Sequence, residues 1–317
     1  MNDQQRQQNI FFIVECAEKA CILEVSSEKP GNVTPTKSFS DVSYKDFVLG
    51  ARAMKPSVAE AAIRGYRVGV IGGGRVSLAN VRVGYLIKDA VLRVKASHSG
   101  GNTHLGTIML LVPLAAAAGL CLGRKWGYVR LHDALREVVG CSTVQDSLDL
   151  FDAVNSANAG GLGESDLDVR SAESKTTLLE GKMSFLRVME YSSQRDMIAM
   201  EVAGGMPVVF ETSERLKGLS ETAGDLRTAI VQAYLTVLSE HADTLVARKA
   251  GWAEAEKISF KAKKVLERGG TLSPRGRKAL SEFDEYLRSD GNKLNPGTTA
   301  DIIAAALMVC LLRKDIV

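Results

Sequence analysis

The stretch that decides the fold is LGTIMLLVPLAAAAGLCLG, residues Leu105 to Gly123, which contains no charged side chain. A helix of this length could span a bilayer. However, Pro113, the alanine run Ala115 to Ala118 and the closing glycines make it only mildly apolar, and no aromatic belt flanks it. The middle of a large helical domain also requires a helix that is apolar on every side. We therefore predict a buried core helix with no membrane association.

The composition around this stretch favours helices over sheet. The chain has 317 residues, with 6% aromatic residues, 7 prolines and abundant alanine. Its 40 Lys and Arg against 37 Asp and Glu give a net charge of +3. That balance excludes a globally basic nucleic-acid binder and a highly charged disordered chain. We predict a single all-α domain spanning residues 1–317, with a central buried apolar helix.

Apolar residues recur with helical spacing along most of the chain. Two regions rich in glycine, proline or hydroxyl residues interrupt the pattern: Glu28 to Val42, expected as an ordered loop or a lid, and Asn158 to Arg170. The best strand candidates, both weak, are Arg67 to Ile71 and Pro207 to Phe210. Functional loops are expected at about 26–43, 97–104, 158–170, 241–250 and 290–299. Helices are expected at about 10–25, 44–55, 57–70, 78–96, 104–121, 128–139, 144–157, 171–180, 183–202, 221–240, 251–268, 275–288 and 298–313.

Cysteine and histidine spacing argues against disulfide and zinc frameworks. The five cysteines form no Cys-x-x-Cys pair, and the four histidines show no His-Glu-x-x-His spacing. The polar N-terminus lacks the apolar core of a signal peptide. These features predict a cytoplasmic protein.

Four polar clusters interrupt the helices: Glu24 to Asn32, Ser99 to His104, His241 to Lys249, and Asn295 to Asp301. The second and fourth immediately precede predicted helices, whose free N–H groups suit an anion such as phosphate. Each cluster also has a structural interpretation. Asp46 after Ser43, and Asp301 after Thr298, fit capping boxes. Glu24 could lie at a solvated helix end, His104 could be a core histidine, and Arg248-Lys249 could be a solvated face.

The segment from Arg64 to Lys95 carries seven cations and one acid, Asp89, a net charge of +6. A polyanionic ligand and a surface balanced by acids elsewhere in the fold explain it equally well. Ile71-Gly-Gly-Gly-Arg75 matches neither nucleotide-binding glycine pattern and is interpreted as a flexible turn.

In this order the clusters resemble the triphosphoribosyl-dephospho-CoA synthase family. The motifs that carry the resemblance are Glu24-Val-Ser26 with Lys29-Pro-Gly31, Gly100-Gly-Asn-Thr-His-Leu-Gly106, Asp243-Thr244 followed by Arg248-Lys249, and Asn295-Pro-Gly-Thr-Thr-Ala-Asp301. Tyr44-Lys-Asp-Phe47 resembles the family's Lys-Asp pair. The resemblance spans about residues 15–312. It implies an all-helical enzyme in which an acceptor hydroxyl attacks the ribose of ATP, adenine leaves, and the triphosphate stays on an α-linked ribosyl product.

The resemblance also implies roles for individual residues. An oxocarbenium-like state needs carboxylates, and a retained triphosphate needs cations and Mg²⁺ with hard oxygen ligands. Which carboxylate acts as base and which binds metal stays open. The expected catalytic residues are Asp243, Asp46 and His104; the expected metal ligands are Glu24 and Asp301; the expected nucleotide-binding residues are Lys29, Asn32, Asn102, Thr103, Arg248, Lys249, Asn295, Gly297 and Thr298.

Departures from the family pattern fall at Leu105, where close relatives usually carry Lys, and at Asn32, where they usually carry Leu. Only Gly163-Glu164 is left of the family's Gly-Ala-Arg-Gly-Glu-Ala segment. The expected partners are ATP and a hydroxyl acceptor, either dephospho-CoA or another cofactor precursor such as one of tetrahydromethanopterin. A non-catalytic nucleotide-binding protein and a homo-oligomer stay open, and no nucleic-acid or membrane partner is expected.

Overall fold

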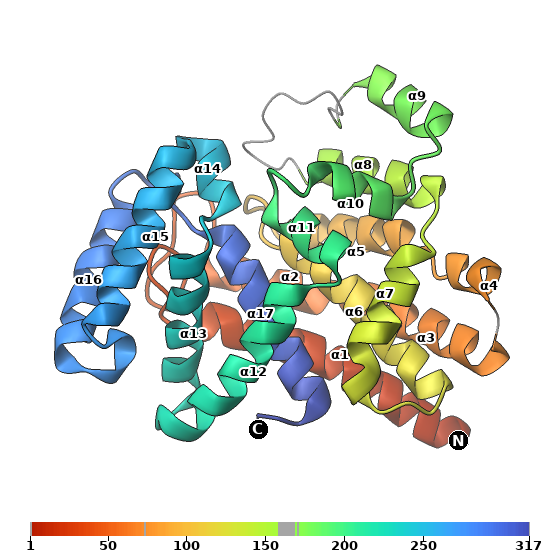
Figure 1. Cartoon of the computed structure of the whole chain (residues 1–317), viewed down its shortest axis with the longest axis horizontal. Coiled ribbons are helices and arrows are strands. Elements are labelled where there is room, and N and C mark those ends of the chain that lie inside the picture. The colour runs from red at the N-terminus through yellow and green to blue at the C-terminus, as the bar shows by residue number, and fades with distance from the viewer. Residues whose placement is uncertain (1, 73, 158–168, 170, 317) are drawn as a thin grey trace.

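A computed structural model of the chain describes residues 2–72, 74–157, 169 and 171–316 (Figure 1). These residues form helices joined by loops, with no strand among them, which confirms the all-α prediction. Their buried apolar side chains make one continuous core. In order, the elements are α1 (Asp3–Ser26), α2 (Tyr44–Ala53), α3 (Lys55–Ile71), α4 (Arg75–Ala79), α5 (Val83–Ser97), α6 (Leu105–Gly123), the 3₁₀ turn η1 (Tyr128–Arg130), α7 (Leu131–Gly140), α8 (Val144–Ser156), α9 (Ala172–Glu180), α10 (Phe185–Ser192), α11 (Met197–Gly204), α12 (Pro207–Thr222), α13 (Leu226–Glu240), α14 (Thr244–Ala250), α15 (Trp252–Glu267), η2 (Gly270–Leu272), α16 (Pro274–Arg288) and α17 (Gly297–Arg313).

Helix α6 is the core helix that the sequence predicts. It is long and apolar enough to cross a membrane, but 83% of its most apolar window is buried inside the protein. It packs closely along α3 because glycines remove the side chains between them. A Cβ at Gly65 of α3 would collide with the Ala116 carbonyl oxygen, and one at Gly119 of α6 with that of Ala62. Glycines on both helices are therefore what permits this close contact.

Helix α17 is the second core helix, with its residues from Ile302 to Leu312 buried. It packs against α1, α12 and α6, so the N-terminal and C-terminal elements lie side by side (Figure 1). The first turns of α6 and α17 meet, because Thr107 donates a hydrogen bond to Asp301 across 194 residues of sequence. This crossing places two of the polar clusters in one region.

Several predicted elements need correction. Both strand candidates are helical: Arg67 to Ile71 ends α3, and Pro207 to Phe210 begins α12. Their apolar residues belong to a helical face, with Val208 and Val209 buried and Pro207 occupying a first-turn position that needs no N–H donor.

Two segments that are each predicted as one helix form two helices in the structure. The predicted helix at 78–96 is α4 and α5, separated by Asn80 to Arg82, where Arg82 has φ 57°. The predicted helix at 183–202 is α10 and α11, separated at residues 193–196. The predicted loop at 241–250 contains α14. The loop expected at 158–170, including Gly163-Glu164, lies outside the described residues apart from Val169.

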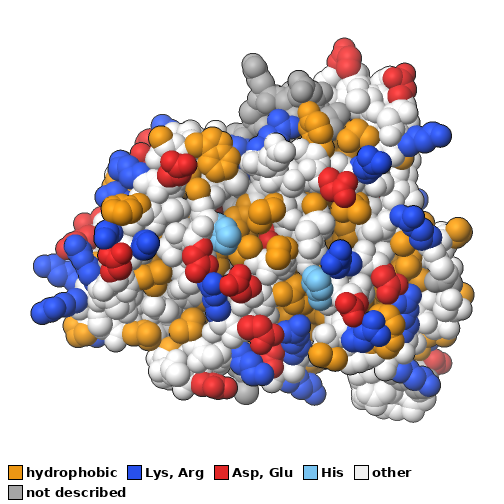
Figure 2. All heavy atoms as spheres, viewed as in Figure 1, with side chains coloured by type: hydrophobic (Ala, Val, Ile, Leu, Met, Phe, Trp, Pro, Cys, Tyr) orange, Lys and Arg blue, Asp and Glu red, His pale blue; other side chains and the backbone are white. Residues whose placement is uncertain are grey.

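The basic segment from Arg64 to Lys95 is balanced by acids within the fold. Arg82 lies 3.0 Å and Lys88 2.8 Å from carboxylate oxygens of Asp149 on α8. Arg93 pairs with Asp89 at 2.8 Å. Acidic and basic side chains are interspersed over the face in Figure 2 as well. Of the two interpretations, the structure supports a charge-balanced surface.

Candidate active site

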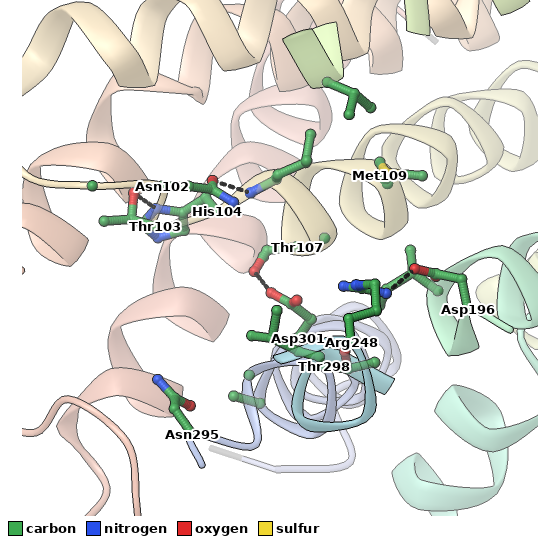
Figure 3. A pocket seen from close by; sticks show the side chains of 18 of the residues that line it. Asn102, Thr103, His104, Thr107, Met109, Asp196, Arg248, Asn295, Thr298 and Asp301 are labelled. Atoms are coloured by element: carbon green, nitrogen blue, oxygen red, sulfur yellow. Dashed lines mark hydrogen bonds and ion pairs between the residues drawn. The ribbon is translucent and has the colours of Figure 1, made fainter. Parts of the chain in front are cut away.

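A cavity of about 690 Å³ opens where the end of α1, the loop after it, and the starts of α6, α14 and α17 converge (Figure 3). The polar clusters before α6 and α17 face the same space. The predicted residues on its wall are Glu24, Asn32, Asn102, Thr103, His104, Arg248, Lys249, Asn295, Gly297, Thr298 and Asp301. Lys29, Asp46 and Asp243 are not on the wall.

Asp301 lies at the centre of the view in Figure 3, where its carboxylate accepts a hydrogen bond from the Thr107 hydroxyl. A Cβ at Gly106 would collide with Asp301 Oδ2, so a glycine at this position is what lets the carboxylate approach α6. Burial raises the pKa of Asp301 to about 8, and the charges of Glu24 and Asp243 add to the rise, while Thr107 opposes it. A carboxylate in this setting gains from a proton or a cation.

Glu24 reaches the cavity from the last turn of α1, with Lys29 behind it. Lys29 Nζ lies 2.9 Å from Glu24 Oε1, and it also donates to the Ser27 carbonyl at 3.2 Å and to the Glu24 carbonyl. An ammonium has three N–H donors, and all three are engaged. Burial raises the pKa of Glu24, and the Lys29 charge opposes that rise. Lys29 therefore holds Glu24, and its geometry offers nothing to a nucleotide.

Asp243 is fully buried and joins two helix starts. Its Oδ1 accepts from the backbone N–H groups of Leu245 (2.9 Å) and Val246 (3.1 Å), capping α14. Its Oδ2 accepts from the N–H and the hydroxyl of Thr299, both at 2.8 Å. The carboxylate faces protein groups on both sides, so the structure supports an organising role in place of the predicted direct one.

The two capping-box candidates have different outcomes. Asp46 Oδ2 accepts from the Ser43 N–H at 2.8 Å and the Ser43 hydroxyl at 2.7 Å, and the two residues form a capping box at the start of α2. The structure thus favours the capping interpretation of Asp46 over a catalytic one. At α17 the N-cap residue is Pro296, which offers no side-chain cap, and Asp301 faces Thr107 and the cavity.

His104 precedes α6 and is 3% exposed, although it reaches the cavity wall. Its Nδ1 lies 2.7 Å from Thr103 Oγ1, and its ring packs on Phe47 with centroids 5.2 Å apart. Burial, followed by the neighbouring His98, lowers its pKa to about 3. A ring with so low a pKa is a weak base near pH 7, which suits a hydrogen-bonding group better than a general base.

Two cations on α14 face the cavity. Arg248 pairs with Asp196, the N-cap of α11, and its buried Nε has no hydrogen-bond partner. Lys249 Nζ donates to the Asn292 carbonyl at 3.1 Å, and burial lowers its pKa. Both are positioned to meet an anion that enters the cavity.

Sequence reasoning missed part of the wall. Arg195 and Asp196 line it, but a helix predicted straight through 183–202 hid the break that places them. Asp196 followed by an apolar segment is an N-cap signal that could have revealed this break. The apolar part of the wall comes from α6, α8, α10 and α11 and includes Met109, Leu150, Phe151, Val154, Val188, Met189 and Ile198.

The residues present fit a divalent cation that arrives with a ligand. Among the described residues, no three His, Cys, Asp or Glu side chains group closely enough to hold a metal alone. Glu24 and Asp301, however, present two carboxylates to one cavity, and Mg²⁺ is usually bound through one or two carboxylates together with substrate phosphates.

Comparisons with known proteins identify relatives of the whole chain. A 2-(5''-triphosphoribosyl)-3'-dephosphocoenzyme-A synthase from Klebsiella pneumoniae is 24% identical over 297 residues, covering 92% of this chain and 88% of that protein. A Malonomonas rubra protein given the same name provisionally is 24% identical over 302 residues, covering 94% and 86%. A crystal structure from Archaeoglobus fulgidus, whose assignment as a triphosphoribosyl-dephospho-CoA synthase is also provisional, has the same fold, with a TM-score of 0.61, 23% identity, and coverage of 83% of this chain and 97% of that one. The sequence model of the CitG family, described as ATP:dephospho-CoA triphosphoribosyl transferase, matches residues 11–316, and the chain belongs to this family.

Proposed function

We propose that this protein transfers the triphosphoribosyl group of ATP to a hydroxyl of 3'-dephospho-CoA and releases adenine. The observation that carries the proposal is the meeting of Asn102 to His104 with Asn295 to Asp301 in one cavity. Both segments also belong to the region matched by the transferase family.

The reaction breaks the bond between the anomeric carbon and adenine and forms a bond from that carbon to the acceptor oxygen. The acceptor hydroxyl loses a proton, and the departing adenine gains one. Positive charge develops on the ribose, which a nearby carboxylate stabilises. Glu24 and Asp301 are the carboxylates on the wall that the family motifs contain, and we assign them this electrostatic role.

The triphosphate carries more negative charge than Arg248 and Lys249 can offset. We propose that Glu24 and Asp301 also hold Mg²⁺, which would neutralise the phosphates when bound. The raised pKa of Asp301 supports this, because a cation removes the cost of ionising a buried carboxylate. A soluble enzyme that uses ATP belongs in the cytoplasm, and we propose that location.

A second acceptor is a candidate because two of the departures from the family pattern lie on the cavity wall. Leu105 and Asn32 line it, although Asn32 Nδ2 is also tied to the Tyr234 hydroxyl at 2.8 Å. Close relatives usually carry a Lys at the position of Leu105. Because this chain lacks that cation, we expect an acceptor with less negative charge, such as a precursor of tetrahydromethanopterin. Ribosyl transfer to it would follow the same chemistry.

Incubation with Mg-ATP and each acceptor, followed by chromatography, tests the proposal. We expect adenine to appear in a 1:1 ratio with a product that keeps three phosphates. Asp301→Asn should lose adenine release, whereas the matched Asp89→Asn, at a surface pair with Arg93, should keep it. Release of ADP or inorganic phosphate without adenine would refute the proposed chemistry.

A further inference from the structure

Trp252 is an exposed aromatic side chain on the wall of the cavity. It is 48% exposed, and it begins α15 directly after Gly251, whose φ of 90° breaks the chain between α14 and α15. Leaving an indole half in water forgoes much of the stabilisation that its burial would give. A ligand that covers the ring would recover that stabilisation.

The other tryptophan of the chain has an indole ring that is covered by two arginine side chains. Trp126 has the guanidinium carbons of Arg130 and Arg124 at 3.9 Å and 4.6 Å from its ring centroid. Within the described part of the chain, Trp252 has no comparable aromatic or cationic neighbour. Its ring is thus available to a flat partner that enters the cavity.

Polar groups on the same wall suit the edge of such a partner. Lys249, Asn292 and Asn295 all line the cavity, and Asn295 Oδ1 is buried without a hydrogen-bond partner. Buried polar atoms are rarely left unpaired unless a ligand or water completes them. A purine combines a π face for an indole with amino and ring-nitrogen groups for amides.

We propose that Trp252 is a stacking platform for the adenine ring of a nucleotide substrate. The inference rests on the proposed function, in which ATP and dephospho-CoA both carry adenine. The chemistry recognised is the purine ring, and the experiment below distinguishes which nucleotide supplies it.

Fluorescence of a single-tryptophan protein tests the stacking directly. Since the chain has 2 tryptophans, Trp126→Phe leaves Trp252 as the sole indole reporter. Titration with ATP, dephospho-CoA and inorganic tripolyphosphate should quench its emission with at least one adenine nucleotide but not with tripolyphosphate. The nucleotide that quenches identifies the source. If Trp126→Phe folds poorly, the difference in quenching between wild type and Trp252→Phe gives the same information.

Affinity gives an independent measurement. Trp252→Ala should raise the Kd of the quenching nucleotide about tenfold, as expected for loss of one base–aromatic stack, measured by calorimetry. The Kd of tripolyphosphate should change less than about twofold. Phe260→Ala is the matched control, because Phe260 is a 60% exposed aromatic on the same helix that does not line the cavity.

The proposal is overturned if calorimetry detects bound nucleotide while Trp252 emission stays unchanged, or if Trp252→Ala binds both nucleotides as tightly as wild type. Emission that depends only on protein concentration would instead assign Trp252 to a contact between copies of the chain, and would also overturn it. Adenine release without quenching would refute the stacking proposal and leave the proposed function standing. Quenching without adenine release would refute the proposed function and leave the stacking proposal standing.

Discussion

Replacing Asp243 by Asn tests whether this carboxylate organises the site or reacts in it. The substitution keeps the volume and exchanges one acceptor oxygen for an amide donor. In one orientation the new N–H₂ faces the N–H and hydroxyl of Thr299; in the other it faces the N–H groups of Leu245 and Val246. Either way two hydrogen bonds are lost, and donors face donors in a fully buried site.

The expected cost follows from those contacts. A buried donor left without its acceptor costs about 1–3 kcal/mol, so the two affected donors predict a loss of about 2–6 kcal/mol in the free energy of unfolding. Burial raises the pKa of Asp243, and the Thr299 hydrogen bonds oppose that rise. The native carboxylate therefore depends on these same groups, and the amide should not be tolerated as an equivalent cap.

Urea denaturation, monitored by circular dichroism, measures the effect. We expect a lower midpoint for Asp243→Asn with an unchanged slope. Asp225→Asn is the matched control: Asp225 caps α13 and accepts from Thr228 N at 3.0 Å, but this site is exposed. Asn and Asp cap exposed helices almost equally well, so the urea midpoint of Asp225→Asn should barely change.

One result would refute this reasoning. If Asp243→Asn unfolds at the wild-type midpoint yet releases no adenine, the carboxylate takes part in the reaction, as the sequence alone suggests. A lowered midpoint with adenine release persisting well below it would place Asp243 outside the chemistry.

Three further substitutions probe buried groups. Lys29→Met should destabilise the fold by about 3–5 kcal/mol in urea denaturation, because it leaves Glu24 as an unpaired buried charge, and Lys29→Met/Glu24→Gln should recover much of that loss. Burial raises the pKa of Glu201 from 4.5 to about 7. The stabilisation from Glu201 is therefore complete below pH 4.5 and is lost as the pH rises through 7. Glu201→Gln should flatten this pH dependence of the urea midpoint, which corresponds in the wild type to as much as about 3 kcal/mol in the free energy of unfolding. His104→Gln should leave the pH dependence of adenine release unchanged between pH 5 and 8, since a ring with a pKa of about 3 does not titrate there, and a lost limb in the pH–rate profile would contradict this.

The sequence predicts the helical class well because the two central core helices have clear local signals, although α12 and α14 are not predicted as helices. The uncharged run at α6 and the apolar start of α17 are read directly from their residues, and both are buried in the structure. The strand errors at residues 67–71 and 207–210 arise because a short run of β-branched residues occurs in helices as well as in strands. Only the neighbours across the core decide between them.

Site prediction fails where the deciding contact is distant in sequence. Ser43 with Asp46 and Thr298 with Asp301 have the same local spacing, and both fit a capping box. Asp46 does cap α2, whereas Asp301 instead accepts from Thr107, far away in sequence. No local pattern separates the two cases. Similarly, the apolar cavity wall of α8 and α10 has the spacing of an ordinary core face.

The carboxylates expected to form one chemical set therefore divide into two kinds. Glu24 and Asp301 face the cavity, each with a different partner behind it: the ammonium of Lys29 and the hydroxyl of Thr107. Asp243 instead joins the start of α14, the helix of Arg248 and Lys249, to the start of α17, the helix of Asp301. Loss of that junction would displace a cation and a carboxylate together. An inactive Asp243 variant would consequently look like a loss of chemistry in any activity assay, and only the free energy of unfolding distinguishes a displaced site from a missing reactive group.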